Sequence, residues 1–77
     1  MVTMKLKNIH NNIYYYECFP ENKETNLFTI GIDFDKKELV YLSLPEMNNY
    51  VSHAKWRLLK TYEETNHIPE HETSVWY

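Results

Sequence analysis

The sequence predicts a small α+β domain: an antiparallel four-stranded β-meander with one C-terminal helix packed on one face. Three observations lead to this fold class. Four segments between residues 2 and 44 alternate polar and apolar residues or are rich in aromatic and β-branched ones. Polar, turn-forming residues separate these segments. Beyond them, apolar residues recur at helical spacing. With 77 residues and no repeat or linker, we expect one domain over 1–77, with a sheet over 2–44, a helix over 46–65 and an ordered tail over 66–77.

The first two predicted strands are residues 2–9 and 13–19. The first alternates weakly, with Val2, Met4 and Leu6 on one side. The second, IYYYECF, is rich in aromatic residues, which favour strands. Asn11 and Asn12 lie between them, and asparagine tolerates the left-handed backbone conformation. We therefore expect a tight turn at 10–12.

Residues 26–34 and 38–44 form the clearest predicted hairpin, because both alternate with a period of two. A two-residue loop would leave Val40 on the wrong face. A three-residue loop at 35–37 instead pairs Ile32 with Val40 and places Tyr41 opposite Gly31, where its ring can cover the bare backbone. Leu39 is then expected on the outer face. The register extends to one cross-strand row of Leu6, Tyr16, Ile30 and Leu42.

The helix is expected to begin at Glu46, directly after Pro45, and to end at Asn66. One apolar stripe should face the sheet, made of Met47, Val51, Ala54, Leu58 and Tyr62.

A second apolar patch lies on the opposite side of this helix. At 100° per residue, Trp56 is about half a turn from the stripe, and Leu59 leans to the same side. A fully solvated Trp is uncommon, so we expect something to cover it. Tyrosine and tryptophan are enriched at interfaces. The predicted interaction surface therefore combines the outer sheet face with the patch on the helix and the tail: Tyr15, Tyr41, Leu39, Trp56, Leu59 and Trp76.

No pattern in the sequence specifies a reaction. Cys18 and His53 could be imagined as a thiolate pair, but Cys18 lies on the expected core face, where a free cysteine acts as a small hydrophobe. The sequence contains no glycine-rich phosphate loop, nucleophile elbow or paired-acid motif. We expect no catalytic residues, and therefore no enzyme.

Metal and cofactor sites are also not expected. His67 and His71 are four residues apart, which suits one ion on a helix, but Pro69 between them argues against a helix. The acids around the hairpin at 33–38 lack the loop length and glycine of a dedicated calcium site.

Charge and composition bear on partners and location. The net charge is −3 with a pI of about 5.7, and Arg57 is the only arginine, so nucleic-acid binding is not favoured. Cys18 is the only cysteine, and no signal-like apolar run precedes Lys5. No apolar stretch approaches the ~20 residues of a membrane span. We expect a cytoplasmic protein without a membrane partner.

Four short motifs carry a resemblance to a known group: YYYE at 14–17, FPE at 19–21, IPE at 68–70 and VWY at 75–77. This layout resembles a group of short bacterial proteins of uncharacterised function that end in Trp-Tyr. The resemblance implies that the terminal Trp76-Tyr77 belongs to the domain.

The function expected from the sequence is a non-catalytic protein–protein interaction, with another protein or as a homodimer. Two alternatives remain open. One is a small nucleic-acid-associated regulator that stacks bases on the sheet-face tyrosines. The other is a small-molecule or metal binder.

Overall fold

The computed structural model describes residues 1–76 and has an α+β fold, with one antiparallel sheet and one helix. The sheet has five strands in the order β4-β3-β2-β1-β5, so the expected count of four is wrong. The elements, in chain order, are β1 (Val2–His10), β2 (Ile13–Pro20), β3 (Phe28–Asp33), β4 (Glu38–Leu42), α1 (Asn49–Thr65) and β5 (His71–Ser74).

The additional strand, β5, comes from the segment that was expected to be only an ordered tail. It pairs antiparallel with β1, with Val2 opposite Ser74 and Lys5 opposite His71. Its sequence, HETS, has no alternation of apolar and polar residues. Pairing with β1 rather than local preference makes it a strand.

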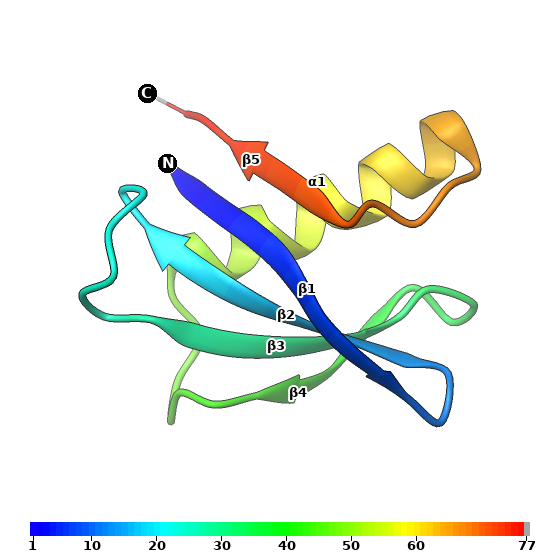
Figure 1. Cartoon of the computed structure of the whole chain (residues 1–77), viewed down its shortest axis with the longest axis horizontal. Helices are drawn as coiled ribbons and strands as arrows, with labels where there is room; N and C mark the ends of the chain where they lie inside the picture. The colour runs from blue at the N-terminus through cyan, green and yellow to red at the C-terminus, as the bar shows by residue number, and fades with distance from the viewer. Residues whose placement is uncertain (77) are drawn as a thin grey trace.

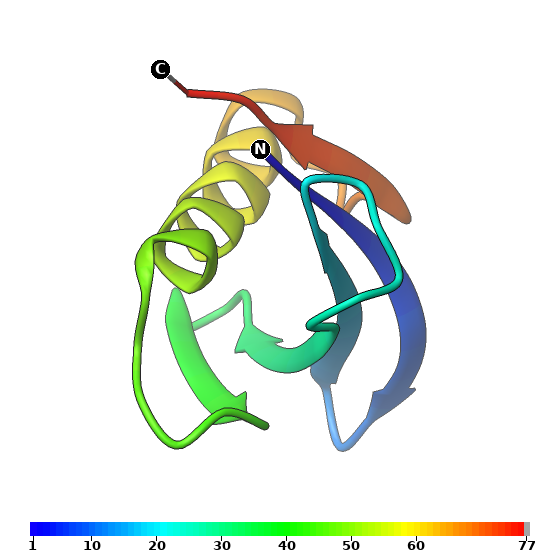
Figure 2. The ribbon, with the colours of Figure 1, turned by 90° about the vertical axis from the view of Figure 1, so that its left-hand side faces the viewer.

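The sheet is strongly curved, and α1 lies on its concave side (Figures 1 and 2). In Figure 2 the helix lies across the open side of the curve, between β4 and β5. The chain therefore crosses from one sheet edge to the other through α1. The core between the two layers contains Val2, Met4, Tyr16, Cys18, Phe28, Ile30, Ile32, Phe34, Val51, Ala54 and Leu58.

The predicted cross-strand row is confirmed. Leu6 pairs with Tyr16, Tyr16 with Ile30, and Ile30 with Leu42. The pair of Gly31 and Tyr41 is confirmed as well. The turn between β1 and β2 is also as predicted, because Asn11 and Asn12 both have positive φ, at 51° and 64°.

The outer end of the β3–β4 hairpin differs from the prediction. The register shifts between Gly31 and Ile32, so Ile32 pairs with Leu39 instead of Val40. Leu39 consequently packs against the core, whereas Val40 is 46% exposed. The connection spans residues 34–37, one residue more than expected, and Lys37 has a φ of 57°. A bulge lets Leu39 and Leu42 both reach the core, which strict alternation does not allow.

The helix begins later than predicted and ends where predicted. Asn48 is its N-cap, and the Asn48 side chain accepts a hydrogen bond of 2.9 Å from the Val51 amide. This hydrogen bond caps the helix at Asn48, so the helix begins at Asn49 and not at Glu46. Asn66 caps the other end in the left-handed conformation, with φ at 59°.

The apolar stripe of α1 is confirmed for the residues inside the helix. Val51, Ala54 and Leu58 are fully buried, and Tyr62 is partly buried. Met47 precedes the helix and is 52% exposed, so its assignment to the stripe is wrong.

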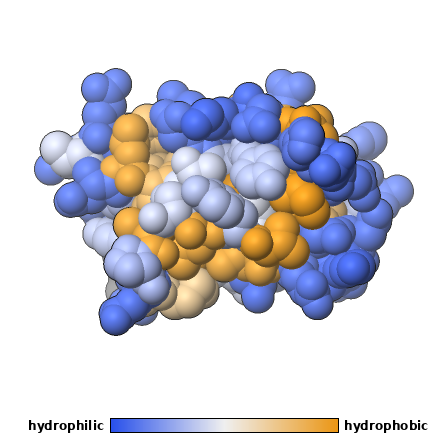
Figure 3. Space-filling view, turned by 90° about the horizontal axis from the view of Figure 1, so that it is seen from below, coloured by the Kyte–Doolittle hydropathy of each residue, from blue (hydrophilic) through white to orange (hydrophobic). Residues whose placement is uncertain are grey.

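Seen from below, from the side on which β4 lies in Figure 1, the surface carries a band of hydrophobic side chains between hydrophilic margins (Figure 3).

Candidate functional site

Trp56 lies on the outer side of α1, as the helical spacing predicts. It is 53% exposed, while the stripe on the other side of the same helix is buried. The ammonium group of Lys60 lies 5.1 Å from the centroid of the indole ring, which is a cation–π contact. The expected cover over Trp56 is therefore incomplete in residues 1–76.

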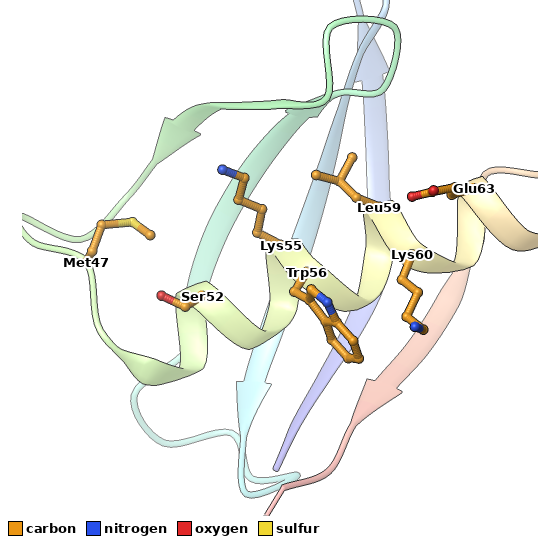
Figure 4. A pocket seen from close by; sticks show the side chains of 7 residues that line it. All are labelled: Met47, Ser52, Lys55, Trp56, Leu59, Lys60 and Glu63. Atoms are coloured by element: carbon orange, nitrogen blue, oxygen red, sulfur yellow. The ribbon is translucent and has the colours of Figure 1, made fainter.

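Two hollows flank Trp56. The first has a volume of about 480 Å³ and is the one drawn in Figure 4. In this view Lys55 and Leu59 point to one side of the helix, and Trp56 and Lys60 to the other. The residues that line this first hollow are Met47, Ser52, Lys55, Trp56, Leu59, Lys60 and Glu63.

The second hollow, of about 430 Å³, lies between α1 and the segment after β5. Trp76 forms one wall of it. The Trp76 ring stacks on His53, with centroids 3.8 Å apart and planes 4° apart. The rings of Trp76 and Tyr50 meet edge to face, with centroids 5.6 Å apart. The other lining residues are Ser52, Trp56, Ser74 and Val75.

These contacts show that Trp76 packs on α1. Tyr77 lies outside the described residues. Three of the six predicted surface residues, Trp56, Leu59 and Trp76, therefore come together on or beside α1. We call the exposed part of this region, Trp56 with the linings of the two hollows, the α1 outer face.

Tyr15 and Tyr41 form a separate group on the convex face of the sheet. Their rings meet edge to face, with centroids 5.8 Å apart. They pack over Gly31: a Cβ atom placed there would lie 2.9 Å from Cε1 of Tyr15 and 3.0 Å from Cβ of Tyr41. Leu39 does not join them, because the bulge turns it to the core, and its assignment to the outer face is wrong.

The six predicted residues therefore do not form one surface. The core residues beneath α1 alternate with Tyr15 and Gly31 along their strands, so the tyrosine pair and α1 lie on opposite faces of the sheet. A third hollow, of about 320 Å³, is beside the tyrosines, and its lining residues are Lys7, Asn8, His10, Tyr15, Thr29 and Tyr41.

Glu72 is a structurally important residue that the sequence interpretation missed. It lies on β5, accepts a 2.7 Å hydrogen bond from Oγ1 of Thr61, and lies 3.4 Å from Nε of Arg57. Burial raises the pKa of Glu72. The hydrogen bonds from Thr61 and the Thr73 amide and the nearby Arg57 charge lower this pKa by more than burial raises it, so the net pKa is below the usual value. This cluster fastens β5 to α1 and holds the tail beside Trp56. The partners are far apart in sequence, so no local pattern indicates them.

The structure shows the surroundings of the residues that were considered for chemistry. Cys18 is fully buried, and burial followed by the charge of Glu17 raises its pKa to about 12, so the thiol is protonated at neutral pH. His53 is stacked on Trp76. His67 and His71 are exposed, and residues 1–76 contain no group of three His, Cys, Asp or Glu side chains that could hold a metal ion.

Within residues 1–76, no helix is both long enough and apolar enough to cross a membrane. Comparisons of the chain with protein-family models, with curated proteins and with solved structures found no match.

Proposed function

We propose that this chain is a non-catalytic protein–protein interaction domain and that the α1 outer face is its contact surface. The observation that carries the proposal is Trp56, which is half exposed between two hollows on a helix whose opposite side is fully buried. Its single cysteine suits a reducing compartment, so we place the interaction in the cytoplasm.

The physical basis is the free energy of burying the exposed half of the indole. Removing apolar surface from water is worth about 25 cal/mol per Å², and Trp is among the residues most enriched in binding hot spots. Three charged side chains, Lys55, Lys60 and Glu63, line the same hollow as the ring. An apolar centre with a charged margin is the arrangement that protein interfaces share.

Site-specific photo-crosslinking tests the proposal. A photoreactive phenylalanine analogue is placed at exposed position 52, which lines both hollows and leaves Trp56 in place, or at exposed position 38 on β4 as the matched control, in cells that express the chain from its own gene. We expect a discrete adduct from position 52 and none from position 38. Absence of an adduct at position 52, or equal adducts from both positions, would refute this function.

One observation favours a second candidate, the binding of single-stranded nucleic acid on the convex face. The hollow beside Tyr15 and Tyr41 is also lined by Lys7 and His10, so aromatic rings for base stacking lie next to cationic groups. Titration of a labelled single strand at low salt tests it. Salt-sensitive binding that Tyr41→Ala weakens would support it, and no binding at tens of micromolar protein would exclude it.

A further inference from the structure

We propose that the partner of the α1 outer face is a second copy of this chain, bound with the two α1 helices antiparallel about a two-fold axis at Leu59. This inference rests on the proposed function and names its partner. Two features of the face support it, the order of its charges and the position of Trp56, and the available area sets the expected strength.

The charges along the face are self-complementary. Lys55 lies four residues before Leu59 and Glu63 lies four residues after it. At 1.5 Å rise per residue, each is about 6 Å from the axis. The two-fold operation therefore places Lys55 of one copy opposite Glu63 of the other, and the reverse pair forms at the same time.

Within the single chain these charges are unused. The ion pairs that residues 1–76 form are those of the Met1 ammonium with Glu21 and of Arg57 with Glu72. Lys55, Lys60 and Glu63 have no such partner in this part of the chain, although all three line the hollow in Figure 4. A partner with the reverse order of charges would pair with Lys55 and Glu63, and an antiparallel second copy has that order.

Trp56 lies in a suitable position for this geometry. It is three residues before Leu59, about 4.5 Å from the axis along the helix. In the pair, each indole reaches past Leu59 of the other copy towards the hollow of about 480 Å³ beside it. Each copy thus contributes the same ridge and the same hollow, as an isologous interface requires.

The available area indicates a weak dimer. A standard interface removes about 800 Å² from each partner, about a sixth of the 5064 Å² that this chain exposes. The helical part of the face, 17 residues or about 25 Å long and about 10 Å wide, supplies only part of that standard area. We therefore expect a dissociation constant on the order of 10–100 µM at low salt.

Sedimentation equilibrium of the purified chain from about 5 µM to 1 mM tests the inference. We expect a monomer–dimer equilibrium for the wild-type chain. Lys55→Glu and Glu63→Lys should each raise the dissociation constant about tenfold, because each places like charges opposite one another twice. An equimolar mixture of the two variants should restore dimerisation, because every facing pair is then opposite in charge. Trp56→Ser should abolish it.

The control variant is Lys7→Glu, which makes the same charge change as Lys55→Glu but on the exposed bulge of β1. It should leave the dissociation constant within twofold of the wild-type value. Thermal unfolding of every variant at low concentration confirms that each is folded.

A wild-type chain that stays monomeric at 1 mM would overturn the inference. So would a dimer whose dissociation constant is unchanged by Trp56→Ser, or a mixture of the two charge-reversed variants that does not dimerise. The crosslinking experiment then separates the two proposals. A position-52 adduct of twice the chain mass supports both. An adduct of any other mass, with a monomeric purified chain, overturns the second copy and leaves the interaction domain standing. No adduct and no dimer overturns both.

Discussion

A methyl group added at Gly31 would have almost no room on the convex face of the sheet. Its Cβ would lie 2.9 Å from Cε1 of Tyr15, 3.0 Å from Cβ of Tyr41 and 3.2 Å from Cγ2 of Ile13. The Tyr15 ring can turn away at the cost of its edge-to-face contact with Tyr41. The Cβ atom of Tyr41 cannot, because it is fixed to the backbone of β4.

The sign of the stability change shows whether side-chain crowding or backbone conformation decides the effect of Gly31→Ala. Gly31 has no positive φ, so alanine suits its conformation and by propensity alone would stabilise the strand by about 0.5–1 kcal/mol. Overpacking costs about 1–3 kcal/mol. We therefore expect Gly31→Ala to lower the free energy of unfolding by about 1–2 kcal/mol, and the melting temperature by about 10 °C for a chain of this size.

Urea denaturation of four chains measures this: wild type, Gly31→Ala, Tyr15→Ala and the double variant. Removing the Tyr15 ring eliminates the closest contact, so Gly31→Ala should cost about 1 kcal/mol less in the Tyr15→Ala background. A Gly31→Ala chain as stable as the wild type, or a cost that is the same in both backgrounds, would refute the argument that the tyrosine pair requires a bare backbone.

Three further predictions concern the core and the anchoring of the tail. Tyr16 is fully buried and donates a 2.6 Å hydrogen bond to the carbonyl oxygen of Pro69; Tyr16→Phe leaves that oxygen without its donor, and thermal unfolding should show a loss of about 1–2 kcal/mol. Folding lowers the Glu72 pKa, so the stability that its ionised form contributes is complete above the usual glutamate pKa and is lost as pH falls below it. Urea unfolding between pH 3 and pH 7 should therefore show a flatter acid limb for Glu72→Gln than for the wild type. Because the Cys18 pKa is raised to about 12, its thiolate population at pH 8 is about 10³-fold below that of a free thiol. An aromatic disulfide reagent should label Cys18 at least that much more slowly in the folded chain than in urea.

The parts of the fold that the sequence predicts are those where burial and turn chemistry agree. Tyr16, Ile30 and Leu42 have apolar side chains on the same side of neighbouring strands, and a slip of one residue would expose them all. Asn11, Asn12 and Asn66 occur where the chain needs positive φ, and asparagine accepts that conformation better than most residues.

Strict alternation fails where a bulge intervenes. Leu39, Val40 and Leu42 cannot all face the core of a regular strand, and the sequence alone does not say which is excluded. The structure excludes Val40, because the longer connection at 34–37 shifts the register by one residue at that point. For the same reason Leu39 is absent from the candidate surface, although neighbouring Tyr41 belongs to the tyrosine pair.

The composition of the α1 outer face was only partly predictable, because it depends on two different kinds of information. Trp56 follows from helical geometry alone, whereas Leu59 lines the same hollow but points to the other side of the helix and packs against the core. Trp76 follows from β5, and β5 exists because its backbone pairs with β1 and because Glu72 is held by Thr61 and Arg57.

The same anchoring explains why Trp56 stays open. The concave side of the sheet covers the inner side of α1. The contacts of Glu72 with Thr61 and Arg57 bring the segment after β5 alongside the helix, where Trp76 stacks on His53 instead of crossing over Trp56. Weakening these contacts with Glu72→Gln should loosen the stack of Trp76 on His53 before it affects the sheet. Its effect on dimerisation would therefore show whether the tail only borders the α1 outer face or shapes it.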